Sequence, residues 1–284
     1  MKSFDEKNNK LFNESKIKQV FLRILKENDI DTELFEKNCE TINVIKRKKF
    51  KHGEDAMYDI FDNNLLVKDN HYVDVIWHEI LHMSSSVRCG NIAYSGVSYV
   101  LLNNTRVGYG LNEGVTVLID FMFFKGITKK HDIKSDTYEI EKILCGMLYD
   151  VLGSFLLKCY FNADFYGLYN YLISLNGVKK TDRFYEAFDA LCYEGYYSNN
   201  SDKIKNEKIF NAYKYAYYYL VELLIKKLHF NYENGIIEES VYKDALSKAD
   251  TVFSDVFFIS KTGEKFEISK EKIRELIKKN ISNI

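Results

Sequence analysis

The segment WHEILHMSSS, residues 77–86, contains the pattern His-Glu-x-x-His. In a helix, residues four apart lie one above the other on the same face, so the Cβ atoms of His78 and His82 would be about 5–6 Å apart. From that separation both imidazoles can reach one zinc ion at about 2.0–2.1 Å. Glu79, rotated by about 100° from His78, would miss the metal but could hold a water molecule bound to it. The segment therefore predicts two neutral metal ligands and a carboxylate that accepts a proton from zinc-bound water.

The helix that carries this pattern is expected from about residue 70 to residue 86, with Asp69 or Asn70 as its cap. Apolar residues recur at helical spacing and predict a face packed into the core: Val73, Ile76, Trp77, Ile80 and Leu81. The alternative interpretation is an ordinary helix with two histidines on its polar face. Since the pattern arises by chance about once in a hundred in a chain with six histidines, a metal site also requires a third ligand.

Catalytic zinc sites use three protein ligands and leave the fourth position to water. His71 cannot be the third ligand, because seven residues of helix place it about 10.5 Å from His78 along the axis. The longer metzincin pattern, His-Glu-x-x-His-x-x-Gly-x-x-His, is excluded, since its glycine and last histidine would fall at Ser85 and Arg88. The third ligand must come from elsewhere in the chain.

The segment GYGLNEGVTVLIDFMFF, residues 108–124, offers that ligand. From residue 113 it is almost wholly apolar, so we expect a buried helix over about 112–124, with the polar side chains Glu113, Thr116 and Asp120 on one face. A buried, unpaired carboxylate is costly, and a zinc ion would remove that cost. Glu113 also lies in the expected first turn, where the helix dipole favours a negative charge. The alternative is a capping glutamate at a solvent-facing helix start, but the polar stripe behind Glu113 favours a metal ligand.

The order of these motifs resembles the gluzincin branch of the zincin metallopeptidases, in which an H-E-x-x-H helix is followed by a helix that begins with Asn-Glu-Gly. More specifically, YDIFDNNLLV, HEILHMSSS and GYGLNEGVTVLI resemble zincin-like proteins of low-GC Gram-positive bacteria, with the pattern HELxHMASS and then GLNEGYTxLL. The resemblance covers about residues 56–175. It implies a zincin-like fold, zinc bound by His78, His82 and Glu113, and Glu79 as the general base.

The chain departs from the thermolysin-like pattern in two respects. Thirty residues separate His82 from Glu113, more than is usual, and Val117 stands where an aspartate would orient a histidine ligand. Thr116 or Asp120 would then support the ligands instead.

The long spacing contains a predicted hairpin, which supplies four candidates for stabilising the oxyanion of a tetrahedral intermediate: Tyr94, Tyr99, Arg106 and Tyr109. In some related zincins a tyrosine shortly before the glutamate ligand has this role. Arg106 lies seven residues and Tyr109 four residues before Glu113, and we select Tyr109 as the candidate.

The hydrophobic periodicity predicts an α+β fold. In residues 1–125, the zincin-like half, we expect a small β-sheet over the H-E-x-x-H helix: a helix at 15–27, a strand within 41–50, a hairpin within 56–68 about Asp62-Asn63-Asn64, and a second hairpin whose strands 93–102 and 105–110 flank Asn103-Asn104. Residues 126–284 form a helical lobe with one hairpin at 256–269 about Thr262-Gly263, and its helices are expected at 136–152, 154–175, 183–193, 203–229, 236–250 and 270–281. No linker separates the two parts, which favours one continuous catalytic unit.

Composition favours a soluble globular protein without a nucleic-acid partner. The 284 residues are 46% hydrophobic and 29% charged, and 40 Lys and Arg against 41 Asp and Glu give a net charge of −1. With so little net charge, the protein has no positive electrostatic field that would attract nucleic acid. The N-terminus does not read as a secretory signal, no apolar run reaches the length of a membrane span, and the five cysteines form no C-x-x-C pair. We therefore expect a cytoplasmic protein, with export by a route that needs no recognisable signal left open.

These features together predict a zinc-dependent metallopeptidase that acts on a peptide or protein substrate. The strand NNLLV, residues 63–67, is expected to be an edge along which an extended peptide could pair. Two alternatives stay open: a non-catalytic zincin-fold protein that keeps zinc for structure or binding, and a metal-free helical interaction protein. Intact Glu79 argues against the first, and one zinc ion bound per chain would exclude the second.

Overall fold

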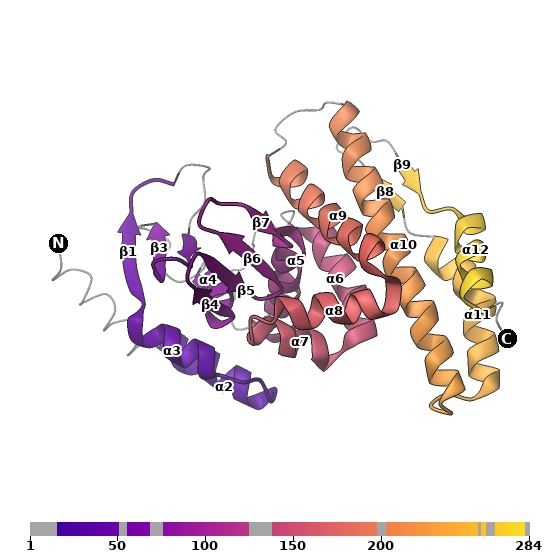
Figure 1. Ribbon diagram of the computed structural model, residues 1–284, viewed down its shortest axis with the longest axis horizontal. Coiled ribbons are helices and arrows are strands. Elements are labelled where there is room, and N and C mark those ends of the chain that lie inside the picture. Colours follow the sequence, from indigo (N-terminus) through magenta and orange to yellow (C-terminus); the bar gives the residue numbers. More distant parts are fainter. Residues whose placement is uncertain are drawn as a thin grey trace.

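The computed structural model describes residues 16–50, 56–68, 76–124, 138–197, 203–254, 257–259 and 265–281. The first half of the described chain combines short helices with small sheets (Figure 1): α2 (Lys16–Glu27), α3 (Glu33–Thr41), β1 (Asn43–Arg47), β2 (Ala56–Asp59), β3 (Asn64–Lys68), α4 (Ile76–Ser84), β4 (Ser86–Cys89), β5 (Ile92–Ser95), β6 (Ser98–Leu101), β7 (Arg106–Val107), α5 (Tyr109–Ile119) and the π-helical turn η1 (Asp120–Phe124). The second half is mostly helical: α6 (Glu139–Leu152), α7 (Ser154–Phe161), α8 (Phe165–Asn176), α9 (Val178–Tyr197), α10 (Lys203–Glu233), α11 (Glu239–Ser254), β8 (Phe257–Ile259), β9 (Lys265–Glu267) and α12 (Lys270–Ile281). The predicted α+β class, with small sheets and a mostly helical C-terminal part, is confirmed.

The first sheet has the strand order β1-β3-β2. β1 runs parallel to β3, whereas β2 is antiparallel to it, with Tyr58 opposite Leu65. β3 carries three consecutive buried residues, Leu65, Leu66 and Val67, as expected of a strand covered on both faces. NNLLV is therefore central, and the prediction that it forms a free edge is wrong; within the described residues, β1 and β2 are the outer strands. Local periodicity identifies a strand but not its neighbours, and here the parallel pairing of β1 decides the order.

Helix α4 ends at Ser84, before the predicted end at residue 86, and the chain passes directly into β4. The serine side chains explain the early end. The Ser84 hydroxyl donates to the carbonyl oxygen of Leu81 at 2.8 Å, and the Ser86 hydroxyl donates to that of His82 at 2.5 Å. Hydroxyl groups that bond the last carbonyl oxygens compete with continuation of the helix.

The second sheet is antiparallel, with the order β4-β5-β6-β7. Residues 93–102, expected as one strand, are divided between β5 and β6 by a turn at Gly96, whose φ is +54°. Glycine adopts such a conformation more readily than any other residue, and a Cβ here would lie 2.0 Å from Asn112 Oδ1. The predicted turn at Asn103-Asn104 is present between β6 and β7.

Helix α5 lies between the second sheet and the C-terminal helices, where α6 and α9 pack against it (Figure 1). It begins at Tyr109, three residues before the predicted start, and continues into η1. Further differences concern other helices, among them α9, which begins at Val178 and not at the expected residue 183. α3 was not predicted, and the helix expected at 154–175 is divided into α7 and α8, because Ala163 adopts a positive φ of 52° and Asp164 caps α8 by accepting the Gly167 N–H.

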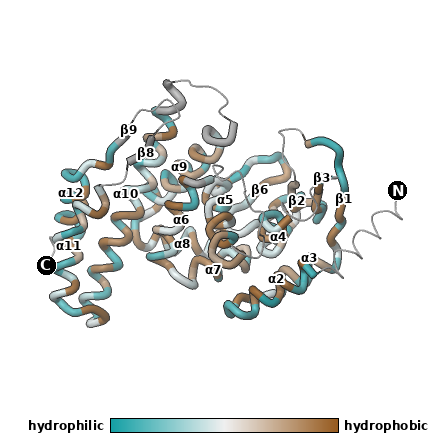
Figure 2. The backbone as a smooth tube through the Cα atoms, turned by 180° about the vertical axis from the view of Figure 1, so that it is seen from behind, coloured by the Kyte–Doolittle hydropathy of each residue, from teal (hydrophilic) through white to brown (hydrophobic). Residues whose placement is uncertain are grey.

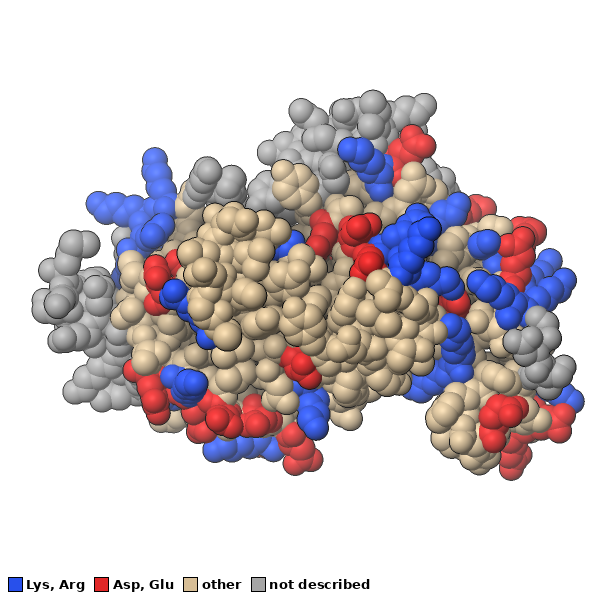
Figure 3. Space-filling view, in the orientation of Figure 1, with Lys and Arg blue, Asp and Glu red and all other residues tan. Residues whose placement is uncertain are grey.

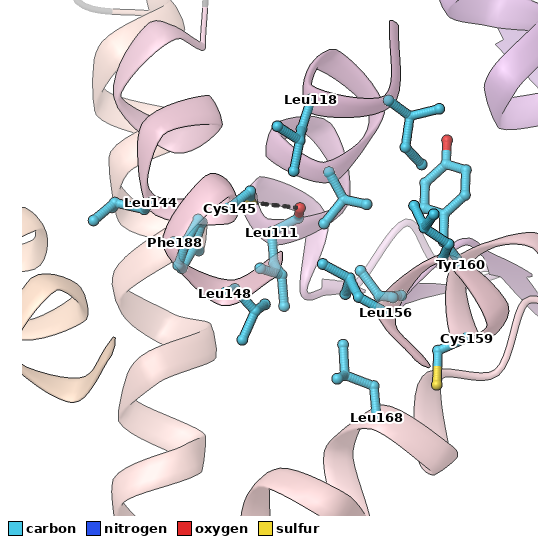
Figure 4. Close-up of a cluster of buried hydrophobic side chains, with 14 of the residues drawn as sticks. Leu111, Leu118, Leu144, Cys145, Leu148, Leu156, Cys159, Tyr160, Leu168 and Phe188 are labelled. Atoms are coloured by element: carbon cyan, nitrogen blue, oxygen red, sulfur yellow. Dashed lines mark hydrogen bonds between the residues drawn. The ribbon is translucent and has the colours of Figure 1, made fainter. Parts of the chain in front are cut away.

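Most of the buried apolar side chains in the described residues belong to a cluster that extends from Phe21 of α2 to Leu276 of α12. Figure 4 shows part of it, where Leu111 of α5 lies close to α6 and the Cys145 thiol donates to the Leu111 carbonyl oxygen at 3.8 Å. In Figure 2 the hydrophobic helix α7 lies near the middle of the molecule, whereas α2 alternates between hydrophilic and hydrophobic residues. The predicted boundary between two parts near residue 125 falls within 125–137, outside the described residues.

On the face shown in Figure 3, basic and acidic side chains are interspersed around a broad uncharged area. Among the described helices, none by itself combines the length and hydropathy of a membrane span. α6 and α7 reach these values only when taken together, and they meet at a bend of 112°.

Candidate metal centre

His78 and His82 project from one face of α4 toward a common point. Their Nε2 atoms are 3.0 Å apart, and their ring centroids are 4.7 Å apart with the planes at 79°. This convergence follows from the four-residue spacing on a helix. The His78 side chain is 25% exposed and that of His82 12%, so the pair is more open to solvent at His78.

Glu113 reaches the same point from α5. Its Oε2 lies 3.1 Å from His78 Nε2, and its Oε1 lies 3.3 Å from His82 Nε2. One ligand atom from each of the three residues lies within 4.8 Å of the others, so the group could hold a metal ion. In the part of the chain that the structure describes, no other group of three His, Cys, Asp or Glu side chains meets this condition. Two imidazoles and a carboxylate suit zinc and other first-row divalent metals.

The position of Glu113 within its helix differs from the prediction. Because α5 begins at Tyr109, Glu113 lies in the second turn rather than the first. The effect of the helix dipole falls off within the first turn, so it favours the Glu113 charge less than predicted. The carboxylate is 4% exposed, and the two imidazoles provide its compensating partners.

Within the ligand group, which we define as His78, His82 and Glu113, contacts between the members shift the pKa values of His78 and Glu113. Burial lowers the pKa of His78, but the hydrogen bond to Glu113 and the charges of Glu113, Glu79 and Asp120 outweigh burial and raise this pKa to about 9. Burial raises the pKa of Glu113, yet His82 and His78 bring it well below its usual range. Both shifts favour a charged Glu113 carboxylate beside a protonated His78, whose proton a bound cation would have to displace.

Glu79 lies outside the ligand group and is directed toward the first sheet. Its Oε2 accepts the backbone N–H of Tyr58 at 2.7 Å. Tyr58 belongs to β2, an outer strand of the described sheet, and this N–H is not used in pairing with β3. A carboxylate next to His78 in the sequence is thereby held at a strand edge.

The two predicted supporting residues, Thr116 and Asp120, are buried. The Thr116 hydroxyl donates to the Asn112 carbonyl oxygen and pairs with the Tyr160 hydroxyl, both at 2.8 Å. It therefore joins α5 to α7. Asp120 is the first residue of η1, and its charge contributes to the raised pKa of His78. Asp120 thus acts on a ligand directly through charge, whereas Thr116 acts through the packing of α5.

Tyr109, the predicted oxyanion donor, lies one helical turn before Glu113. Its hydroxyl forms a hydrogen bond with that of Tyr138. The charge of Glu113, followed by burial, raises the pKa of Tyr109 well above its usual value, so the hydroxyl keeps its proton. The guanidinium of Arg106 lies over the Tyr109 ring, 4.7 Å from the centroid.

The other two tyrosine candidates have their partners on α8. Tyr94 and Tyr99 face each other across β5 and β6. Their ring centroids lie 6.1 Å from Tyr166 and 4.9 Å from Phe165, respectively. These contacts make the pair part of the packing between the second sheet and α8.

Asn112 contacts the ligand group and was not predicted to do so. It is 2% exposed; its Oδ1 accepts the Val97 N–H at 3.1 Å, and its Nδ2 lies 3.3 Å from His82 Nδ1. The contact leaves His82 Nε2 directed at Glu113. A polar residue next to Glu113 in an apolar helix was the available signal, but the orientation of Asn112 depends on the turn at Gly96, which packs against it.

No protein-family model matches this sequence, and neither the curated proteins nor the solved structures include a significant match.

Proposed function

We propose that this protein is a zinc-dependent metallopeptidase in which His78, His82 and Glu113 bind the metal. The observation that carries the proposal is that the Glu113 carboxylate contacts both imidazoles, although thirty residues separate His82 from Glu113 in the sequence. A carboxylate this deeply buried needs compensation for its charge. The compensating groups come from an H-E-x-x-H helix, and the three side chains form the donor set of a catalytic zinc site.

Glu79 is the proposed general base. When bound, zinc lowers the pKa of a water molecule and polarises the carbonyl group of a substrate. Glu79 is next to the ligand His78 in sequence but outside the ligand group, so its carboxylate is available for proton transfer. Tyr109 is the proposed donor to the oxyanion, since its hydroxyl stays protonated one turn from Glu113.

The outer strand β2 is the proposed docking edge for an extended peptide. The hydrogen bond between the Tyr58 N–H and Glu79 holds the base at that edge. A peptide that paired along β2 would compete with Glu79 for the Tyr58 N–H and would then lie beside the base and the candidate ligands, so a peptide or protein is the proposed substrate.

A non-catalytic zinc-binding protein is the second candidate, and one observation favours it. The Tyr58 N–H donates to Glu79 Oε2 at 2.7 Å, so one oxygen of the carboxylate is already bonded to the backbone of β2 rather than directed at the three candidate ligands. Under this alternative the site holds zinc for structure or binding, and no peptide is cleaved.

Elemental analysis combined with a peptide-library cleavage assay tests both candidates. We expect one zinc ion per chain, and we expect Glu79→Gln to keep the zinc and lose cleavage by about 10²–10⁴-fold, because the amide cannot accept the proton. Glu40→Gln, at an exposed position of α3, is the matched control and should cleave like the parent. Zinc without cleavage in the parent would support the second candidate, and a protein that binds no zinc would refute both.

A further inference from the structure

The start of α5 lies one turn before Glu113 and has no cap of its own. The first N–H groups of a helix lack intrahelical partners. The N-cap residue of α5 is Gly108, which has a φ of +74° and no side chain that could accept from these groups. The partners must come from another part of the chain.

Asp189 of α9 provides them. Its Oδ2 accepts the Gly108 N–H at 3.0 Å, and its Oδ1 accepts the Gly110 N–H at 2.8 Å. One side chain from the C-terminal half therefore accepts two N–H groups at the start of α5, and its negative charge lies at the positive end of the helix dipole.

The two glycines allow α9 to approach this closely. A Cβ at Gly110 would lie 2.0 Å from the Phe188 carbonyl oxygen, and a Cβ at Gly108 would lie 2.9 Å from the Tyr185 ring. Both neighbours belong to α9 and lie close to Asp189 in sequence. The Gly-Tyr-Gly start of α5 thus fits against this part of α9 in a way that side chains would prevent.

We propose that Asp189 is a positioning residue for the metal centre. Glu113 follows Gly110 by three residues, about 4.5 Å along the axis, so a shift at the start of α5 moves the Glu113 carboxylate with it. Metal–ligand distances tolerate deviations of only about 0.2 Å. By fixing the start of α5, Asp189 holds Glu113 against His78 and His82, and α9 completes a site whose ligands all lie in the first half of the chain. This inference rests on the proposed function in one respect, the binding of a metal.

Cobalt(II) is the probe for the test, because its affinity and its visible absorption both report the ligand geometry. The variants are Asp189→Ala, Asp189→Asn and, as a control, Thr181→Val. Thr181 lies on the same helix, but its hydroxyl pairs with the Tyr219 hydroxyl of α10 at 3.1 Å. Its loss therefore removes a contact between α9 and α10 and leaves the contacts between α9 and α5 in place. Amide hydrogen exchange at residues 108–110 is measured on the same proteins without metal.

For Asp189→Ala we expect cobalt affinity to fall by about 10–100-fold, as for other residues that orient metal ligands, with a changed visible spectrum and faster exchange at residues 108–110. Asp189→Asn keeps one acceptor oxygen, so its cobalt affinity should lie between those of the parent and Asp189→Ala. This variant provides the result if the alanine variant does not fold. Thr181→Val should keep the parent affinity within about twofold. Parent-like cobalt affinity and spectrum in Asp189→Ala would overturn the positioning role alone. A parent protein that binds no cobalt would instead overturn the proposed function, and the positioning role with it.

Discussion

Two buried glutamates, Glu113 and Glu222, occupy similar surroundings in different parts of the molecule. Glu113 is 4% exposed and Glu222 5%, and each carboxylate faces two nitrogen-bearing side chains. Glu113 meets two histidines. Glu222, on α10, is bonded by Lys180 at 2.7 Å and lies 3.4 Å from Lys226. In both cases the cationic neighbours outweigh burial and lower the pKa of the carboxyl group.

The difference lies in how readily the two kinds of partner lose a proton, since the ordinary pKa of an imidazole is about 6.5 and that of a lysine ammonium group is about 10.4. A neutral imidazole presents a lone pair to a metal, whereas an ammonium group is only a donor. The Lys226 ammonium also donates to the Leu175 carbonyl oxygen at 2.7 Å and to Asn176 Oδ1 at 2.5 Å, so it ties α10 to the end of α8. Buried charge with a shifted pKa therefore identifies both sites, and only the chemistry of the partners separates a candidate metal centre from a structural ion pair.

The largest expected difference between the two glutamates is in metal affinity. Glu113→Ala removes one of three ligands and should lower zinc affinity by more than about 100-fold, beyond the loss caused by residues that only support ligands. Glu222→Ala should leave zinc affinity unchanged and lower the free energy of unfolding by about 1–3 kcal/mol, less than a fully buried pair because its lysines are 38% and 31% exposed. Competition titrations and denaturant unfolding measure the two effects. Equal zinc affinity in both variants would contradict the assignment of Glu113 as a metal ligand and of Glu222 as part of a structural ion pair.

The pH dependence of stability and of metal affinity should further distinguish the Glu113 site from the Glu222 site. The folded-state pKa of His78, about 9, is above its ordinary value of 6.5, so in the metal-free protein its stabilising contribution is complete below pH 6.5 and is lost as the pH rises through 9. Metal affinity should change in the opposite direction, rising by about tenfold per pH unit, or about 100-fold from pH 7 to pH 9, because the cation must displace the proton. The stability that depends on Glu113 is present above its ordinary pKa of 4.5 and is lost as the pH falls below it. Calorimetric titration with zinc at several pH values, with proton release measured, would contradict this if affinity were constant.

The smallest expected effects distinguish two polar neighbours of the ligands on α5. Asn112→Ala removes the contact to His82 Nδ1 and should lower zinc affinity by about 10–100-fold. Thr116→Val removes bonds to the Asn112 carbonyl oxygen and the Tyr160 hydroxyl and should cost less than about tenfold, with a drop in thermal stability. Zinc affinity and melting temperature are measured for both variants. A larger loss of affinity in Thr116→Val than in Asn112→Ala would reverse the roles assigned to them.

Sequence reasoning reached the ligand group because each of its signals is local. The His78 and His82 spacing depends only on helical periodicity, and Glu113 stood out as the first member of a polar stripe on an apolar helix. The errors arose where a remote segment decides the outcome. The predicted start of α5, residue 112, is wrong because no local cap marks Tyr109; the N–H groups of its neighbours Gly108 and Gly110 bond to Asp189 of α9 instead.

By itself, the sequence determined which segments become helices and strands over most of the described chain, and that two imidazoles share one helix face, because these properties depend on residues within a few positions of one another. Only the tertiary structure decided that β3 is central and β2 outer, that Asn112 rather than Thr116 contacts His82, and that Asp189 holds the start of α5. Each of these depends on a contact between elements far apart along the chain, and the pattern of residues within either element does not specify its partner.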